Sequence, residues 1–125
     1  MVLCAAFAAP LPQDVPQEHL PLRVLYAGNA GTPYSAAWTK FLGEHVDEVR
    51  FVAGRDLRRT DLAGVDLLIV DGEVEDHDAN GQLRLKSEHI ELRLADLQGV
   101  PVVLMGGQGG FLSDQLNLKT SWHHG

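Results

Sequence analysis

The strongest constraint on the fold is an alternation, from residue 22 onward, of short apolar runs with segments of helical spacing. Four runs are rich in aliphatic and β-branched residues: RVLYA (23–27), VRFVA (49–53), DLLIV (66–70) and VPVVLM (100–105). Near-continuous apolar strands are typical of a sheet that is buried on both faces, and strands that alternate with helices form parallel sheets. The sequence therefore predicts an α/β fold, a three-layer doubly wound sheet that is mainly parallel and has about four strands.

Three helices are expected around these strands. The first follows Thr32, a candidate N-cap, and has Pro33 at its first position. Its apolar face recurs at positions 38, 41, 42 and 45. A second helix is predicted between Ser87, as cap, and Gly99, just past its end, because apolar residues recur at 90, 94 and 97. A third is expected over residues 111–118.

Length and composition bound the rest. A chain of 125 residues suits one domain, and we assign residues 22–125 to it. Residues 1–21 are rich in Ala and Pro and are interpreted as an N-terminal arm. The net charge of −7 argues against a nucleic-acid partner, and no apolar run is long enough for a membrane span. The single cysteine, Cys4, allows no internal disulfide, so a cytoplasmic location is expected.

Three loops are expected at one edge of the sheet, where ligands bind in doubly wound folds. They follow the first, third and fourth strands and read GNAGT (28–32), residues 71–81, and GGQGG (106–110). The first precedes a helix N-terminus, which offers amide groups to a phosphate or another anion. The residues predicted to bind ligand are Gly28, Asn29, Gly31, Thr32, Asp71, Gly106, Gly107, Gln108 and Gly109.

The second loop carries five carboxylates over residues 71–78, which is a density that attracts cations. The stretch DHDANG (76–81) matches the opening of an EF-hand calcium loop, with Asp76, Asp78 and Asn80 as ligands. The twelfth position, where a bidentate carboxylate belongs, is Ser87. We therefore favour a hairpin with a two-residue turn at Asn80 and Gly81, and keep calcium as the alternative.

Two resemblances concern the first and third strand ends. LYAGNAGTPYSAA (25–37) resembles the FMN-phosphate loop of flavodoxins, which implies a flavodoxin-like fold and an alternative function as an FMN-binding electron-transfer domain. Asp71 resembles the phosphorylated aspartate of response-regulator receivers. Those domains bind Mg²⁺ through acidic residues after the first strand, where this chain has Gly28 and Asn29.

The stretches TDLAGVDLLIVDG (60–72) and VPVVLMGGQGG (100–110) resemble the class I glutamine amidotransferase-like superfamily, in particular its trehalose-utilisation-type branch. The resemblance implies a strand, a sharp glycine elbow and a helix, with a nucleophilic cysteine at the elbow. Gly106 or Gly107 stands at that position here, Cys4 is remote in sequence, and no His-x-Glu pair follows. Since such domains continue for further strands, the chain resembles the N-terminal half, or a reduced form, of that fold.

These features favour a binding domain over an enzyme. The expected ligand is a small anionic or sugar-like molecule, or a protein partner, at the carboxyl edge of the sheet, and the sequence does not identify a cofactor. A metal-dependent hydrolase that uses Asp71, Glu73 and His123 is a further alternative. An uncovered fourth strand would favour aggregation, so we expect either a homodimer or residues 119–125 to cover its edge.

Overall fold

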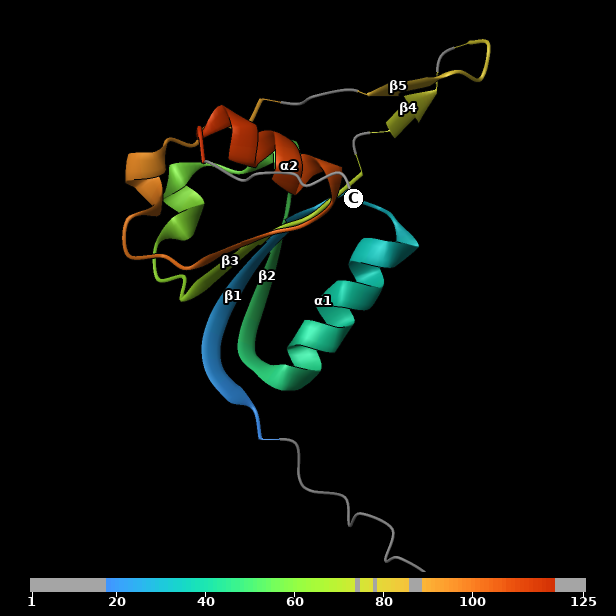
Figure 1. Cartoon of the computed structure of the whole chain (residues 1–125). Coiled ribbons are helices and arrows are strands. Elements are labelled where there is room, and N and C mark those ends of the chain that lie inside the picture. The colour runs from blue at the N-terminus through green and yellow to red at the C-terminus, as the bar shows by residue number, and fades with distance from the viewer. Residues whose placement is uncertain (1–17, 74, 78, 86–88, 119–125) are drawn as a thin grey trace, which may run out of the picture.

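The computed structural model describes residues 18–73, 75–77, 79–85 and 89–118. Four parallel strands form the main sheet in the order β2-β1-β3-β6, and β4 and β5 pair separately as an antiparallel hairpin (Figure 1). In chain order the elements are β1 (Leu20–Gly28), α1 (Pro33–His45), β2 (Val46–Ala53), η1 (Gly54–Asp56), η2 (Arg59–Leu62), β3 (Leu67–Val70), β4 (Glu75–His77), β5 (Leu83–Leu85), η3 (Leu94–Leu97), β6 (Val102–Leu104) and α2 (Gly106–Gln115), where η denotes a 3-10 helix.

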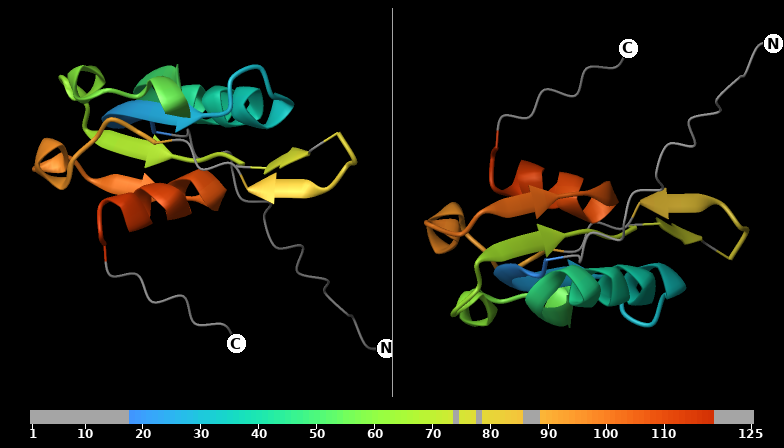
Figure 2. Two further views of the ribbon diagram at one scale, coloured as in Figure 1. Left: turned by 90° about the horizontal axis from the view of Figure 1, so that it is seen from above. Right: turned by 90° about the horizontal axis from the view of Figure 1, so that it is seen from below.

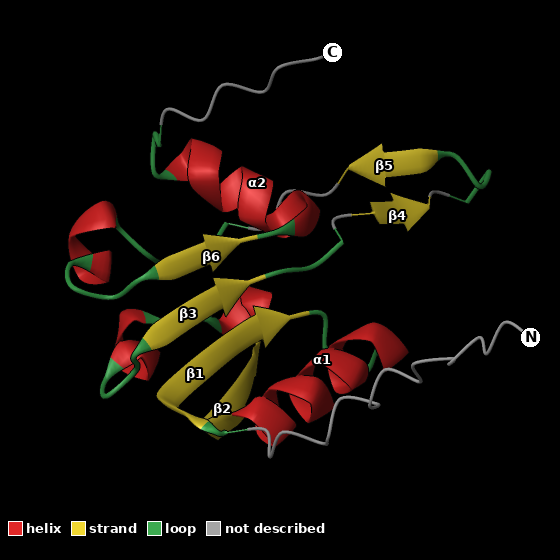
Figure 3. Ribbon diagram, turned by 60° about the horizontal axis from the view of Figure 1, so that its bottom comes forward, coloured by secondary structure: helices red, strands yellow, loops and turns green. Residues whose placement is uncertain are grey.

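The sheet is doubly wound. From β1 the chain crosses through α1 to β2 at one edge, then returns past β1 to β3 and β6. Helix α1 covers one face, whereas α2 lies on the other (Figures 1 and 3). The predicted α/β, flavodoxin-like architecture with about four parallel strands is confirmed. The first strand begins at Leu20, inside the segment that was interpreted as an arm.

Alternate residues of the strands pack into two separate hydrophobic cores, one on each face of the sheet. On β1, Leu25 and Ala27 belong to the core beneath α2, whereas Val24 and Tyr26 belong to the core beneath α1. This is the period of two that strand geometry imposes, with both faces of β1 buried. The near-continuous apolar runs in the sequence are explained by this two-sided burial.

The two faces of the sheet are not covered equally. On β6, Val102 and Leu104 pack against the core that contains Leu112 and Leu116 of α2. Val103, which points to the α1 side, is 40% exposed. Helix α1 therefore covers the β1 and β2 side of its face more fully than the β6 side.

Helix α1 begins as its sequence predicts. Thr32 is the N-cap, and its Oγ1 accepts a hydrogen bond from the amide of Ser35 over 3.2 Å. Pro33 occupies the first turn, where its missing N–H costs nothing, and the helix ends at His45. Leu42 is buried against the sheet, while Phe41 is half exposed.

The helix predicted between Ser87 and Gly99 is wrong. Ile90 and Leu92 are both buried and lie outside any helix, on either side of the bridge between Glu91 and Arg58, and within the described part of this segment only the 3-10 helix η3 forms. The side chain of Gln115 accepts from the amide of Ile90 and donates to the carbonyls of Ile90 and Leu92. These bonds satisfy backbone groups that a helix would have used, and tertiary contacts thus override the local helical pattern.

The C-terminal helix begins five residues earlier than predicted, since α2 starts at Gly106 rather than at residue 111. The GGQGG run is thus the first half of a helix and not a loop. Gly106 has a φ of 63° and makes the bend between β6 and the helix. A Cβ at Gly109 would lie 2.8 Å from the carbonyl carbon of Leu104, so glycine at this position lets α2 pack closely on β6.

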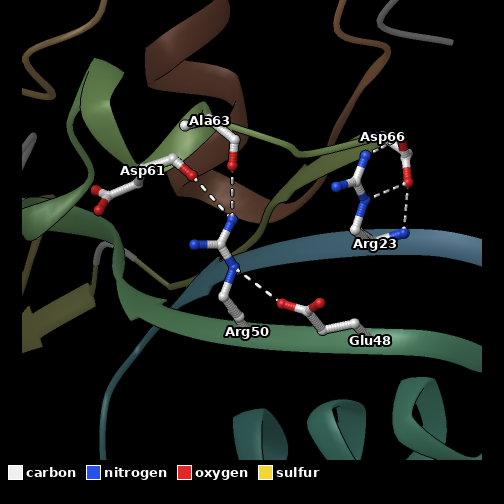
Figure 4. A network of polar contacts seen from close by, with 6 residues as sticks. All are labelled: Arg23, Glu48, Arg50, Asp61, Ala63 and Asp66. Carbon is white, nitrogen blue, oxygen red and sulfur yellow. Dashed lines mark hydrogen bonds and ion pairs between the residues drawn. The ribbon is translucent and has the colours of Figure 1, made fainter.

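Two arginines fasten the β2–β3 connection to the sheet (Figure 4). Arg50 of β2 donates hydrogen bonds to the carbonyls of Asp61 and Ala63 at 3.2 and 3.3 Å. Arg23 of β1 binds Asp66 through its backbone amide at 2.8 Å and its guanidinium at 3.2 Å. These hydrogen bonds hold the pKa of Asp66 below its usual value. They fix the path of the connection that starts at η1.

The hairpin extends past the carboxyl ends of the main strands (Figures 2 and 3). Its last paired residues before the turn are His77 and Leu83, and Gly81 has a φ of 73°. The predicted hairpin is therefore present, and the connection between its last paired residues is longer than the predicted two-residue turn. In the part of the chain that the structure describes, no helix has the length and apolar character needed to cross a bilayer.

Candidate functional site

The loops after β1 and β3 are joined at the carboxyl edge of the sheet by the side chain of Asn29. Its Nδ2 donates to the carbonyl of Glu73 over 3.1 Å, and its Oδ1 accepts from the amide of Glu73 over 2.7 Å. Helix α2 joins the same edge, because the amide of Gln108 donates to the carbonyl of Gly72 over 3.0 Å. The three segments expected to meet at this edge do so.

A pocket of about 230 Å³ opens at this edge, and we call it the polar pocket. Its lining comprises Gly28, Asn29, Ala30, Thr32, Ala53, Gly54, Arg55 and Gln108. It lies between the carboxyl ends of β1 and β2, with α2 contributing Gln108. Of the residues predicted to bind ligand, Gly28, Asn29, Thr32 and Gln108 line it.

Gln108 is the most informative residue of the polar pocket. It is 5% exposed, and its Oε1 has no hydrogen-bond partner among the described residues. A Cβ on Gly54 would overlap its carboxamide, and one on Gly72 would lie 2.6 Å from Oε1. Two glycines thus make room for an amide whose oxygen is unpaired, and an unpaired buried acceptor costs about 1–3 kcal/mol unless a ligand or water satisfies it.

Arg55 supplies the positive charge of the polar pocket, and sequence reasoning missed it. The residue lies in η1, directly after β2, and is exposed. The loop after β2 was not expected to contribute to the site. The signal that could have found it is the pair Gly54–Arg55 after a strand, since a glycine there allows close approach and an arginine binds anions.

The amides of the first turn of α1 are largely occupied. Pro33 has no N–H, and the amide of Ser35 is bonded to Thr32. The amide of Ala36 donates to the Thr32 carbonyl over 3.1 Å, as in any helix. Of the first three helical residues, only Tyr34 has an amide that is not already used in this way. Few donors are therefore left for a phosphate at this turn.

Asp71 does not line the polar pocket. It is 3% exposed and accepts a hydrogen bond from the hydroxyl of Tyr26 over 3.3 Å. Burial raises the pKa of Tyr26 to about 12, and the neighbouring Asp71 carboxylate adds to the shift. The pair lies behind Gly28, where a Cβ would come within 3.1 Å of the Tyr26 hydroxyl. Asp71 is therefore a buried partner of Tyr26 and not a ligand-facing carboxylate.

The remaining predicted glycines serve different purposes. Gly106 forms the bend, and a Cβ there would lie 2.9 Å from Oδ1 of Asp71 and 2.9 Å from the carbonyl oxygen of Gly72. Position 106 therefore has no space for a cysteine side chain in this arrangement. Gly109 is buried in the contact between α2 and β6, and Gly107 is exposed on α2. Gly31 lines a second cavity, beside α1.

The predicted calcium ligands belong to the hairpin. Asp76 lies in β4 opposite Arg84, and Asn80 lies in the turn, whereas Asp78 falls outside the described residues. The described residues of this stretch, 76, 77 and 79–81, form a strand and a turn rather than an EF-hand loop. His123 and Cys4 are also outside the described residues. Within the described ranges, no three His, Cys, Asp or Glu side chains gather as a set of metal ligands.

The chain matches no protein-family model, no curated protein and no solved structure. The geometry of the polar pocket is therefore the basis for a functional proposal.

Proposed function

We propose that this domain binds a small hydroxylated anion, of the kind that a sugar phosphate represents, in the polar pocket. The observation that carries the proposal is the unpaired Oε1 of Gln108, 5% exposed, in a pocket that also contains Arg55. A ligand hydroxyl can donate to Oε1 once the carboxamide turns toward the pocket, and a phosphate or carboxylate can accept from the guanidinium. One small molecule with both groups satisfies both side chains.

Charge supports an anionic ligand at this place. The chain has a formal charge of −7, so an anion needs a local cation in order to bind. Arg55 brings a guanidinium to the pocket, where it can form two parallel hydrogen bonds with a carboxylate or phosphate. A volume of about 230 Å³ suits a small metabolite rather than a long chain.

The elbow supports binding without covalent chemistry. The bend between β6 and α2 consists of a strand, a turn and a helix, as expected for an amidotransferase-like elbow in which Gly106 or Gly107 replaces the nucleophile. Because Asp71 and Gly72 occupy the space of a side chain there, no thiol or hydroxyl can be presented by residue 106. The bend thus supports an amidotransferase-like domain that retains the fold and binds.

A flavin remains the alternative from the sequence. The strand order β2-β1-β3-β6 has its reversal beside β1, where FMN binds in flavodoxin-like sheets. The occupied amides of the α1 first turn disfavour an FMN phosphate in this loop. Quenching of FMN fluorescence on addition of the purified protein would reverse this preference.

Titration of ribose 5-phosphate, ribose and inorganic phosphate into ¹⁵N-labelled protein tests the proposal. We expect ribose 5-phosphate to shift the side-chain amide signals of Gln108 and the backbone amides of Asn29 and Gly54. We expect Arg55→Ala and Gln108→Leu each to weaken this binding at least about tenfold, which corresponds to losing one charged or buried hydrogen bond.

Arg59→Ala is the matched control, because Arg59 is an exposed arginine of η2 outside the polar pocket. The proposal is wrong if ribose 5-phosphate leaves these signals unmoved, or if Arg59→Ala weakens binding as much as Arg55→Ala does.

A further inference from the structure

A second cavity adjoins the polar pocket on the α1 side, and we call it the apolar cavity. Its volume is about 770 Å³, more than three times that of the polar pocket at about 230 Å³. The lining comprises Gly31, Thr32, Pro33, Ser35, Ala36, Thr39, Lys40 and Phe51. Most of these side chains are small or apolar, so this cavity suits a hydrophobic or aromatic group.

The two cavities share a wall. Thr32 lines both of them. On β2, Phe51 lines the apolar cavity and Ala53 lines the polar pocket. Residues two apart on a strand point to the same face and lie roughly 7 Å from each other. A single small molecule can therefore reach from one cavity into the other along β2.

Phe51 offers a flat surface to such a molecule. The residue is 39% exposed although it lies in the sheet, and its ring packs on that of Tyr26 with a centroid distance of 5.8 Å. The contact with Tyr26 holds the ring in place. Little conformational entropy of the Phe51 side chain is therefore lost when a planar ligand group stacks on it. Pro33 adds a rigid apolar residue to the same cavity.

Charge complementarity defines the rest of the ligand. Lys40 lines the apolar cavity and Arg55 lines the polar pocket, so each cavity has one positively charged side chain. An anionic molecule that carries a flat ring, hydroxyl groups and a phosphate meets all of these features. A nucleoside monophosphate has these groups in one molecule.

We propose that the ligand is a nucleoside monophosphate whose base stacks on Phe51 in the apolar cavity while its ribose phosphate occupies the polar pocket. This inference rests on the proposed function, because the phosphate and ribose use Arg55 and Gln108. It adds a specific recognition element, the ring of Phe51, and a ligand class.

Calorimetric titration with AMP, adenosine and ribose 5-phosphate separates the two cavities. AMP is expected to bind at least about fivefold more tightly than ribose 5-phosphate, since stacking of one base on an aromatic ring contributes this much or more. Phe51→Ala is expected to remove that gain and to leave ribose 5-phosphate binding unchanged. Phe51→Trp is expected to keep it, with tryptophan fluorescence that AMP quenches.

Phe41→Ala is the matched control, because Phe41 is an aromatic residue of similar exposure, 49%, that lines neither cavity. Unchanged ribose 5-phosphate binding by Phe51→Ala also shows that this variant is folded. If AMP and ribose 5-phosphate bind equally well, or Phe51→Ala binds AMP as the parent does, the inference is overturned and the proposed function stands. If neither compound binds, both are overturned.

Discussion

The carboxamide of Gln108 occupies the space that a side chain on Gly54 would need. This contact brings helix α2 to the end of β2 at the edge of the sheet. The two elements are far apart in the sequence. The contact leaves Oε1 of Gln108 without a hydrogen bond. A buried polar side chain that is closely packed and unpaired reduces the stability of the free protein, and a ligand can recover the lost energy.

Gln108→Leu is therefore expected to raise stability while it weakens binding. Leucine has a similar size and removes the unpaired acceptor, so the free energy of unfolding should rise by about 1 kcal/mol. Urea denaturation of the two proteins measures this change. Gln98→Leu is the control, because Gln98 caps the end of η3 near the surface, and it should alter stability little. A loss of more than about 1 kcal/mol in Gln108→Leu would show that the amide is paired in solution.

Gly106→Ala tests the crowding at the bend. Alanine at a φ of 63° is strained, and its Cβ would also lie 2.9 Å from both Asp71 Oδ1 and the Gly72 carbonyl oxygen. Gly99 has a similar φ of 76° with no atom within 4 Å of a built Cβ, so Gly99→Ala reports the backbone strain alone.

We expect Gly99→Ala to cost about 1 kcal/mol and Gly106→Ala at least 1–2 kcal/mol more. Equal losses in chemical denaturation would mean that the bend has room for a side chain, which would also weaken the argument against a nucleophile there.

Gln115→Ala tests what holds the segment before η3 in its non-helical form. The side chain makes three hydrogen bonds to the backbone of Ile90 and Leu92, and its removal should cost about 1–2 kcal/mol. The amide of Ile90 should also lose protection in hydrogen exchange. Asp114→Ala changes the neighbouring exposed residue and should do neither. If both variants behave alike, the hydrophobic contacts of Ile90 and Leu92 alone hold the segment.

The raised pKa of Tyr26 predicts that the protein loses stability in alkali. Its pKa rises from 10.0 to about 12 in the folded protein because the ring is buried and Asp71 is close. The unfolded chain therefore loses this proton first, and the free energy of unfolding falls as the pH rises from about 10 to about 12. A shift of two pKa units corresponds to about 2–3 kcal/mol.

Urea denaturation between pH 9 and pH 11.5 measures this fall, and Tyr26→Phe should lack it. Tyr34→Phe changes the exposed tyrosine and should keep it. A Tyr26→Phe profile parallel to that of the parent would show that other groups cause the alkaline loss.

Sequence patterns predicted correctly those elements whose structure depends mainly on neighbouring residues. The strands were predicted because burial on both faces requires an apolar run that can be recognised in the sequence. The helix α1 was predicted because its N-cap Thr32 directly precedes Pro33. The helix predicted between Ser87 and Gly99 was wrong because Gln115, distant in the sequence, binds the backbone of Ile90. Arg55 was missed because its place depends on the end of β2 meeting α2, which no local pattern records. Asp71 was misplaced since the direction of its side chain depends on Tyr26.

The unequal cover of the two sheet faces also bears on how sequences with this fold can vary. Along β6, Val102 and Leu104 are packed beneath α2, while Val103 is 40% exposed on the other side. Drift to a polar residue should be tolerated at position 103 and selected against at 102 and 104. In a parallel strand, where continuous hydrophobicity is the rule, a set of related sequences should therefore show an alternating pattern at β6 and an unbroken one at β1.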